Sequence, residues 1–126
     1  MKRLFFAIGA LILALIICFS GYFVLTSSCG RLIESLEKVS QSAAAENEEE
    51  ALERTEEALK LWEKLNPKIN ALTHHEETDE LEEIVKSLTI FAEQKDLKQL
   101  YEKSQTAINR LEHIEENEKP VFGNIF

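Results

Sequence analysis

The sequence predicts an all-α protein made of a single N-terminal transmembrane helix, a helical stalk and an antiparallel three-helix bundle. The first observation is an uncharged run of 22 residues from Leu4 to Leu25, about the length of a helix that crosses a bilayer. The second is the scarcity of helix breakers, with no glycine between Gly30 and Gly123 and strong helix formers throughout. The third is that apolar residues beyond the run recur at three- and four-residue spacing and never alternate over a strand's length.

The flanks of the apolar run predict its orientation. Lys2 and Arg3 precede the run, and positively charged flanks stay in the cytoplasm. Arg31 follows the other end, but the two charges before the run outweigh it. We therefore expect a single-pass protein of the cytoplasmic (plasma) membrane, with its N-terminus inside and residues 26–126 outside the cytoplasm.

Two alternatives to a retained anchor remain open. A cleaved signal peptide has an apolar region of about 7–15 residues and a small-x-small cleavage site, whereas this run is longer and Thr26 to Cys29 match such a site only loosely. Lipid attachment at Cys29 is the other alternative, because Ser27 and Ser28 precede it, although a bacterial lipoprotein signal has a large apolar residue where Thr26 stands. The retained anchor is favoured, and all three readings place the soluble part outside the cytoplasm.

The charge balance excludes nucleic acid as a partner. The chain has a formal net charge of -9, and without Lys2 and Arg3 the remaining 12 basic residues face 23 acidic ones. Nucleic-acid binding requires clustered cations that displace counterions from phosphate. The acidic surface favours solubility and is repelled by anionic lipid.

Four segments are expected: 1–25 as cytoplasmic flank and anchor, 26–50 as stalk, 51–117 as bundle and 118–126 as an apolar tail. The stalk shows helical periodicity through Leu32, Ile33, Leu36, Val39 and Ala43. The acidic stretch Glu46–Glu50 is either a solvated helix face or a point where like charges loosen the helix.

The first bundle helix is expected from Ala51 onward, with an apolar arc wide enough to pack against two neighbours. The arc comprises Leu52, Ala58, Leu59, Leu61, Trp62, Leu65, Ile69 and Leu72. Pro67 either bends this helix or follows an Asn66 cap as the first residue of a new one. The bend is favoured because the same face continues through Ile69.

Two more helices complete the predicted bundle. His74 to Thr78 interrupts the apolar pattern as a turn, and a helix then begins near Thr78 or Asp79 and ends around Gln94. Asp96, with Gln99 three residues later, is a capping-box arrangement for the last helix. Their apolar positions are Leu81, Ile84, Val85, Leu88, Phe91 and Ala92, then Leu97, Leu100, Tyr101, Ile108, Leu111 and Ile114. Connections this short make neighbouring helices antiparallel.

A bundle of about 70 residues is near the lower limit for a self-sufficient core, which favours docking on another membrane protein or homodimerisation without requiring either. Cys18 and Cys29 are about 16 Å apart on a continuous helix, too far for a disulfide. A homodimer through Cys29 or through the span is compatible with an oxidising exterior.

The last residues carry four large apolar side chains after Pro120, which stops the helix. They are Val121, Phe122, Ile125 and Phe126. They either fold back into a groove of the bundle, which is favoured, or dock on a partner protein. In the second case the partner-binding candidates are Phe122, Asn124, Ile125 and Phe126.

The chain resembles the domain-of-unknown-function family 4363, short single-pass membrane-anchored proteins of spore-forming Firmicutes. The resemblance rests on the basic N-terminus, the single span, the acidic helical domain and a set of residues in a fixed order along the chain. These residues are Trp62, His75, Glu77, Asp79, Asn124, Ile125 and Phe126. Pro67 departs from the helix formers expected there. The resemblance implies a bacterial membrane protein of unknown function and supplies no activity.

The densest cluster of potential metal ligands is His74, His75, Glu77 and Asp79, with His113 on the last helix. A zinc site needs three or four converging groups, and adjacent helical residues point about 100° apart. We therefore favour a polar interhelical turn, with His75 or Asp79 capping a helix, and expect no metal or cofactor.

Catalysis is not expected either, because the acidic residues are too many for their pairing to indicate acid–base chemistry and no nucleophile has a base and an orienting group. Trp62 is expected in the core. The leading hypothesis is a non-catalytic accessory protein that acts by protein–protein contact. The alternative is an extracytoplasmic divalent-metal or pH-responsive sensor using the His74/His75 turn.

Overall fold

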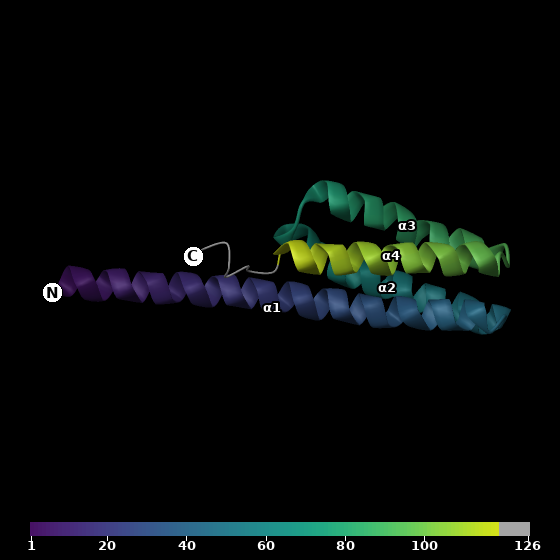
Figure 1. Cartoon of the computed structure of the whole chain (residues 1–126), viewed down its shortest axis with the longest axis horizontal. Coiled ribbons are helices and arrows are strands. Elements are labelled where there is room, and N and C mark those ends of the chain that lie inside the picture. Colours follow the sequence, from purple (N-terminus) through teal and green to yellow (C-terminus); the bar gives the residue numbers. More distant parts are fainter. Residues whose placement is uncertain (119–126) are drawn as a thin grey trace.

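The computed structural model describes residues 1–118, which form four helices joined by short turns (Figure 1). The helices are α1 (Lys2–Ala44), α2 (Glu48–Leu72), α3 (His75–Glu93) and α4 (Leu97–Glu118). No strand occurs in residues 1–118. The predicted all-α class is therefore confirmed.

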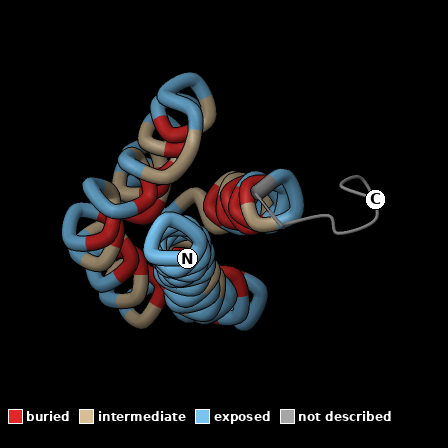
Figure 2. Tube along the Cα trace, turned by 90° about the vertical axis from the view of Figure 1, so that its left-hand side faces the viewer, coloured by how far each residue is buried: buried red, intermediate tan, exposed pale blue. Residues whose placement is uncertain are grey.

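The helices form an antiparallel bundle around one core. The main contacts join α1 to α2, α2 to α3, α3 to α4, and α4 back to α1, so α1 and α3 lie diagonally opposite each other. Figure 2 looks along the bundle and shows the buried faces of the helices turned toward the shared interior. The turns α1–α2 and α3–α4 lie at one end, which we call the far end. The α2–α3 turn and the last turn of α4 lie at the other end, which we call the stem end.

The bundle has four members and not three, because the segment expected as a free stalk packs into it. The second half of α1 buries side chains at alternating spacings of four and three residues: Leu25, Cys29, Leu32, Leu36, Val39 and Ala43. This is the spacing of a helix that packs along its length against others. Each large side chain buried there contributes about 1.5–3 kcal/mol, so the segment does not stay exposed.

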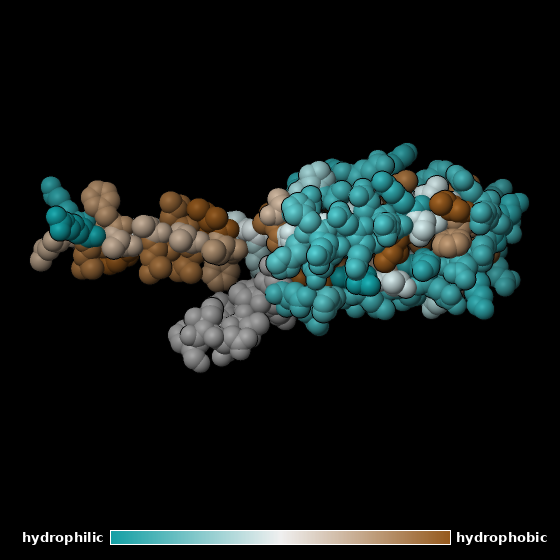
Figure 3. Space-filling model, turned by 90° about the horizontal axis from the view of Figure 1, so that it is seen from above, coloured by the Kyte–Doolittle hydropathy of each residue, from teal (hydrophilic) through white to brown (hydrophobic). Residues whose placement is uncertain are grey.

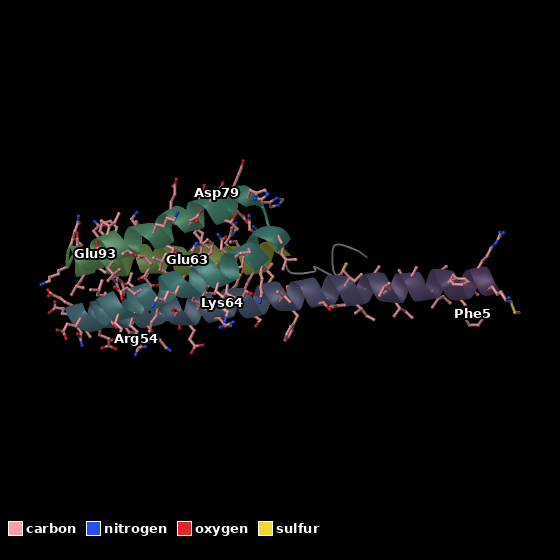
Figure 4. The ribbon with its side chains drawn as sticks, turned by 180° about the vertical axis from the view of Figure 1, so that it is seen from behind. Phe5, Arg54, Glu63, Lys64, Asp79 and Glu93 are labelled. Atoms are coloured by element: carbon pink, nitrogen blue, oxygen red, sulfur yellow. The ribbon has the colours of Figure 1, made fainter. Side chains whose placement is uncertain are left out.

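The first half of α1 is exposed on all sides. Leu4, Phe5 and Phe6 keep 65% or more of their surface accessible, and the most apolar 18-residue window of the helix has no buried residue. Figure 3 shows this segment as a largely brown rod that projects from a largely teal body. Figure 4 shows the Phe5 side chain pointing away from the helix. Residues 4–24 of α1, here called the apolar stem, are long and apolar enough to cross a membrane.

Both far-end turns use the same backbone device. Glu46 and Lys95 adopt positive φ angles of 58° and 60° immediately after helices that end in αR residues. The amide nitrogens of Asn47 and Asp96 then donate to carbonyls five residues earlier, at 3.1 and 2.9 Å. This is the Schellman pattern, formed here without glycine.

The same residues then start the next helices. The side chain of Asn47 accepts a hydrogen bond from the Glu50 amide at 3.2 Å, and the Asp96 carboxylate accepts one from the Gln99 amide at 3.2 Å. The predicted Asp96 cap is thus confirmed. Within the acidic stretch Glu46–Glu50 the helical structure is interrupted between α1 and α2. Glu48–Glu50 occupy the first turn of α2, where carboxylates are favourable.

Two expectations concerned the stem end: the course of α2 at Pro67 and the start of α3. α2 continues through Pro67 as one helix, so Asn66 does not cap a new one. Pro67 and Glu63 are exposed, so water can bond the Glu63 carbonyl that proline leaves without a donor. The expected start of α3 near Thr78 or Asp79 was wrong: α3 begins at His75, and its N-cap residue His74 makes no side-chain capping bond.

The two helical hairpins bury equivalent positions that lie 49 residues apart in the chain. Five buried positions of α1 match five buried positions of α3: Cys29 with Thr78, Leu32 with Leu81, Leu36 with Val85, Val39 with Leu88, and Ala43 with Ala92. Five of α2 match five of α4 in the same way: Ala51 with Leu100, Thr55 with Ser104, Ala58 with Ala107, Trp62 with Leu111, and Leu65 with Ile114. The two hairpins therefore repeat the same pattern of buried positions along the chain.

Candidate functional site

The predicted metal-ligand candidates all lie at the stem end of the bundle but do not converge. His74 and His75 are exposed at the start of α3. Asp79 lies on the outer surface of that helix, as Figure 4 shows. Within residues 1–118 no three histidine, cysteine, aspartate or glutamate side chains are grouped so that they could hold a metal ion.

Glu77 and His113 instead belong to a polar network that ties three helices together. The Thr73 hydroxyl donates to Glu77 Oε2 at 3.2 Å, and Asn117 Nδ2 lies 3.5 Å from Glu77 Oε1. Asn117 Nδ2 also lies 3.1 Å from His113 Nε2. A second link joins the Thr78 hydroxyl to Asn70 Oδ1 at 2.9 Å. The network closes the stem end by fastening the α2–α3 turn to α4.

Cys29 lies in the core of the bundle with no accessible surface. Burial, together with the nearby Glu115 carboxylate, raises the pKa of its thiol to about 12. The thiol therefore stays protonated at physiological pH and is not a nucleophile. A disulfide to a second chain or a lipid on Cys29 would require the bundle to open.

A chain of hydroxyl hydrogen bonds crosses the interface between α1 and α4. Gln105 Nε2 donates to Ser40 Oγ at 3.1 Å, and the Ser40 and Ser104 hydroxyls are 2.6 Å apart. Ser104 in turn donates to the Tyr101 carbonyl at 2.8 Å, so Ser40 is the donor to Ser104. Within residues 1–118 these hydroxyls bond to each other, to the Gln105 amide and to the Tyr101 carbonyl, and the arrangement orders the core.

The sequence did not predict a groove of about 680 Å³ at the far end of the bundle. We call it the far-end groove; its walls are the end of α1, Glu46 and Lys95 of the two turns, Glu48 at the start of α2, and the first two turns of α4. Tyr101 lines it and is 43% exposed. The Lys95 ammonium lies 3.6 Å from the Glu48 carboxylate, which joins the two turns. The turn residues were visible in the sequence, but their proximity follows only from packing α1 beside α4.

Outside the apolar stem, the described surface is polar. The exposed large apolar residues are those of the stem together with Ile90 and Tyr101. Trp62 is 1% exposed and lies in the core, as predicted. The partner-binding candidates Phe122, Asn124, Ile125 and Phe126 lie outside the described residues, as do Pro120 and Val121.

The comparison with protein families gives one match. The family model described as "Domain of unknown function (DUF4363)" matches residues 19–125, which include the last part of the stem and the whole bundle. No curated protein and no solved structure matches the chain. Because the match covers most of the sequence, the predicted resemblance is confirmed at the level of the family: the chain belongs to the DUF4363 family.

Proposed function

We propose that this protein is a non-catalytic accessory protein, anchored in a bacterial cytoplasmic membrane by residues 4–25, that presents an acidic four-helix bundle outside the cytoplasm for contact with a partner protein. The observation that carries the proposal is the continuity of α1. One helix supplies an apolar stem exposed on all sides and then a full member of the bundle core. Within residues 1–118 the stem is left exposed from Leu4 to Ser20, and a bilayer supplies a cover for it.

The orientation and source of the protein are part of the same proposal. Lys2 and Arg3 favour a cytoplasmic N-terminus, and the family resemblance favours a spore-forming bacterium. A non-catalytic role is supported by the protonated, buried Cys29 thiol and by the Ser40 and Ser104 hydroxyls, which hydrogen bond to each other, to the Gln105 amide and to the Tyr101 carbonyl.

The far-end groove is the surface we favour for the partner. It combines an aromatic ring, Tyr101, with both signs of charge from Glu48 and Lys98. Tyrosine is enriched where one protein binds another. The other exposed large apolar residue of the described bundle surface is Ile90 on α3. We propose the partner-binding candidates Phe122, Asn124, Ile125 and Phe126 as a second contact.

The test is crosslinking in cells from a photoreactive residue placed at Tyr101, at Phe126, and at Glu63 as a matched exposed control on α2. A single protein crosslinked from Tyr101, absent from the Glu63 control and lost on Lys98→Glu, would support the far-end groove. A protein crosslinked only from Phe126 would move the contact to the C-terminal segment. Equal crosslinking from all three positions, or crosslinks only within the chain, would contradict a specific partner contact.

A further inference from the structure

We propose that the α2–α3 connection is a second membrane contact, in which Leu72 reaches the hydrocarbon boundary and Thr73 to His75 lie among phospholipid headgroups. The inference rests on the membrane span proposed above and adds to it a surface of the bundle that binds lipid. It begins with the position of the bilayer boundary along α1.

The boundary follows from helix geometry. A helix rises 1.5 Å per residue and the hydrocarbon core is about 30 Å thick. If that core begins at Leu4, directly after the charged Lys2 and Arg3, it ends about 20 residues later, near Val24. Gly21 then lies about 4–5 Å inside the hydrocarbon. A moderate tilt of the helix moves the boundary toward Leu25 and places Gly21 deeper.

The last residue of α2 reaches back to this level. A Cβ atom built on Gly21 would lie 3.5 Å from the Leu72 Cδ2 atom, which is ordinary van der Waals contact. Leu72 also shares a small cavity of about 250 Å³ with Ile17, Cys18 and Tyr22. Ile17 and Cys18 belong to the stem and lie below the first core residue, Leu25. The bundle therefore overlaps the stem at this point and does not stand clear of it.

The residues around Leu72 have the chemistry that this depth requires. Leu72 is only partly buried by the protein, so part of its apolar surface faces the bilayer. The residues that follow are polar, and His74 and His75 are exposed. Tyr22, partly buried on α1 at the same level, belongs to the class of residues enriched at membrane interfaces.

Charge at the stem end selects the lipid. Tyr22 and Thr26 share a groove with Glu112, Glu115 and Glu116, and these carboxylates repel anionic headgroups. The surface therefore fits a bilayer of zwitterionic phospholipid better than an anionic one. We expect the contact to be closest in phosphatidylcholine or phosphatidylethanolamine.

The test uses the full chain in phosphatidylcholine vesicles whose lipids carry bromine on the acyl chains, which quenches nearby tryptophan. The unchanged chain, with Trp62 in the core, provides the baseline. Leu72→Trp is compared with Leu97→Trp, a partly buried leucine at the far end, and with Phe6→Trp in the stem. We expect at least twofold quenching of the added emission for Phe6→Trp and Leu72→Trp, and none for Leu97→Trp.

The outcomes separate the two proposals. Quenching at Phe6→Trp without quenching at Leu72→Trp overturns the second contact and leaves the span intact. No quenching at Phe6→Trp overturns both. Because Leu72→Trp could disturb packing, the unchanged chain is also examined in nanodiscs with spin-labelled headgroups. Broadening of the amide signals of residues 73–75, with residues 45–47 unaffected, supports the contact, and equal signals in both segments overturn it.

Discussion

The two interfaces between the hairpins occupy equivalent places in the bundle but are built differently. Between α1 and α4, Ser40 and Ser104 share a hydrogen bond that Gln105 extends. The equivalent positions between α3 and α2 are Thr89, 49 residues after Ser40, and Thr55, 49 residues before Ser104. Thr55 donates to the Ala51 carbonyl of its own helix at 2.7 Å. The buried Thr89 hydroxyl has no hydrogen-bond partner within residues 1–118.

The feature that the two hairpins repeat is the spacing of their buried residues, not the hydrogen bonds between them. Both hairpins keep the same buried positions and the same turn geometry. One interface has a satisfied polar chain, whereas the equivalent threonines of the other make no hydrogen bond to each other. Substitutions at equivalent positions can therefore separate what the shared spacing contributes from what each interface adds.

The largest effect is expected at the pair Trp62 and Leu111. Trp62→Ala removes the largest buried side chain and should lower the free energy of unfolding by about 3–5 kcal/mol, while Leu111→Ala should cost about 2–5 kcal/mol. Both are measured by urea unfolding of the full chain in detergent micelles, followed by circular dichroism. A cost below 1 kcal/mol for Trp62→Ala would show that the second hairpin holds the core without the first.

The second effect concerns Cys29, whose counterpart Thr78 does not titrate. The folded thiol has a pKa of about 12 against an ordinary value of 9.0, so the folded state holds its proton more tightly than the unfolded state. This contribution is fully present below pH 9 and declines as the pH rises toward 12, by up to about 1.4 kcal/mol per unit. We expect the unchanged chain to lose more stability than Cys29→Ala between pH 8 and pH 10.5. Parallel pH profiles for the two chains would refute this.

The third pair tests the interfaces directly. Ser40→Ala removes the donor to Ser104 and the acceptor of Gln105, and should cost about 1–3 kcal/mol. Thr89→Val replaces an unpartnered hydroxyl with a methyl group of similar size and should stabilise the chain by about 1 kcal/mol. The readout is the midpoint of urea unfolding. Destabilisation by Thr89→Val would mean that its hydroxyl has a partner, such as an ordered water.

The smallest effect is expected at the two far-end turns. Glycine adopts a positive φ without strain, so Glu46→Gly and Lys95→Gly should each stabilise by about 0.5–1 kcal/mol. Lys95→Gly also removes the exposed ion pair with Glu48, so its gain should be the smaller by a few tenths of a kcal/mol. Thermal unfolding of the two variants side by side measures the difference. A larger gain for Lys95→Gly would show that the ion pair does not stabilise the turn.

Much of this architecture could be predicted from the sequence, because period and capping are local signals. The all-α class, the Asp96 cap, the end of α3 near Gln94 and the core position of Trp62 follow from residue spacing alone. The fourth member of the bundle could not be predicted in this way, since the buried face of residues 26–44 contains Cys29, Ser40 and Ala43 among its leucines. Such a face has a weak apolar pattern when it is considered alone, so its burial depends on the neighbouring helices that pack against it.

The candidate site was less predictable than the fold for the same reason. The His74 and His75 cluster is dense in sequence, yet within residues 1–118 it does not gather three ligands around one point: His74 is the N-cap residue of α3 and His75 is its first residue. The far-end groove joins Ala43 and Ala44 to Leu97 and Tyr101. No local pattern links residues more than 50 positions apart, so only the packing of α1 beside α4 shows this groove.

The continuity of α1 gives the molecule a fixed height. From Leu25 to Ala44 the helix rises about 29 Å, so with its stem in a bilayer the far-end groove is held about 3 nm above the hydrocarbon. No hinge interrupts α1 over this distance. A partner must therefore present its own surface within that layer, and removing seven residues from each helix would lower the groove by about 10 Å.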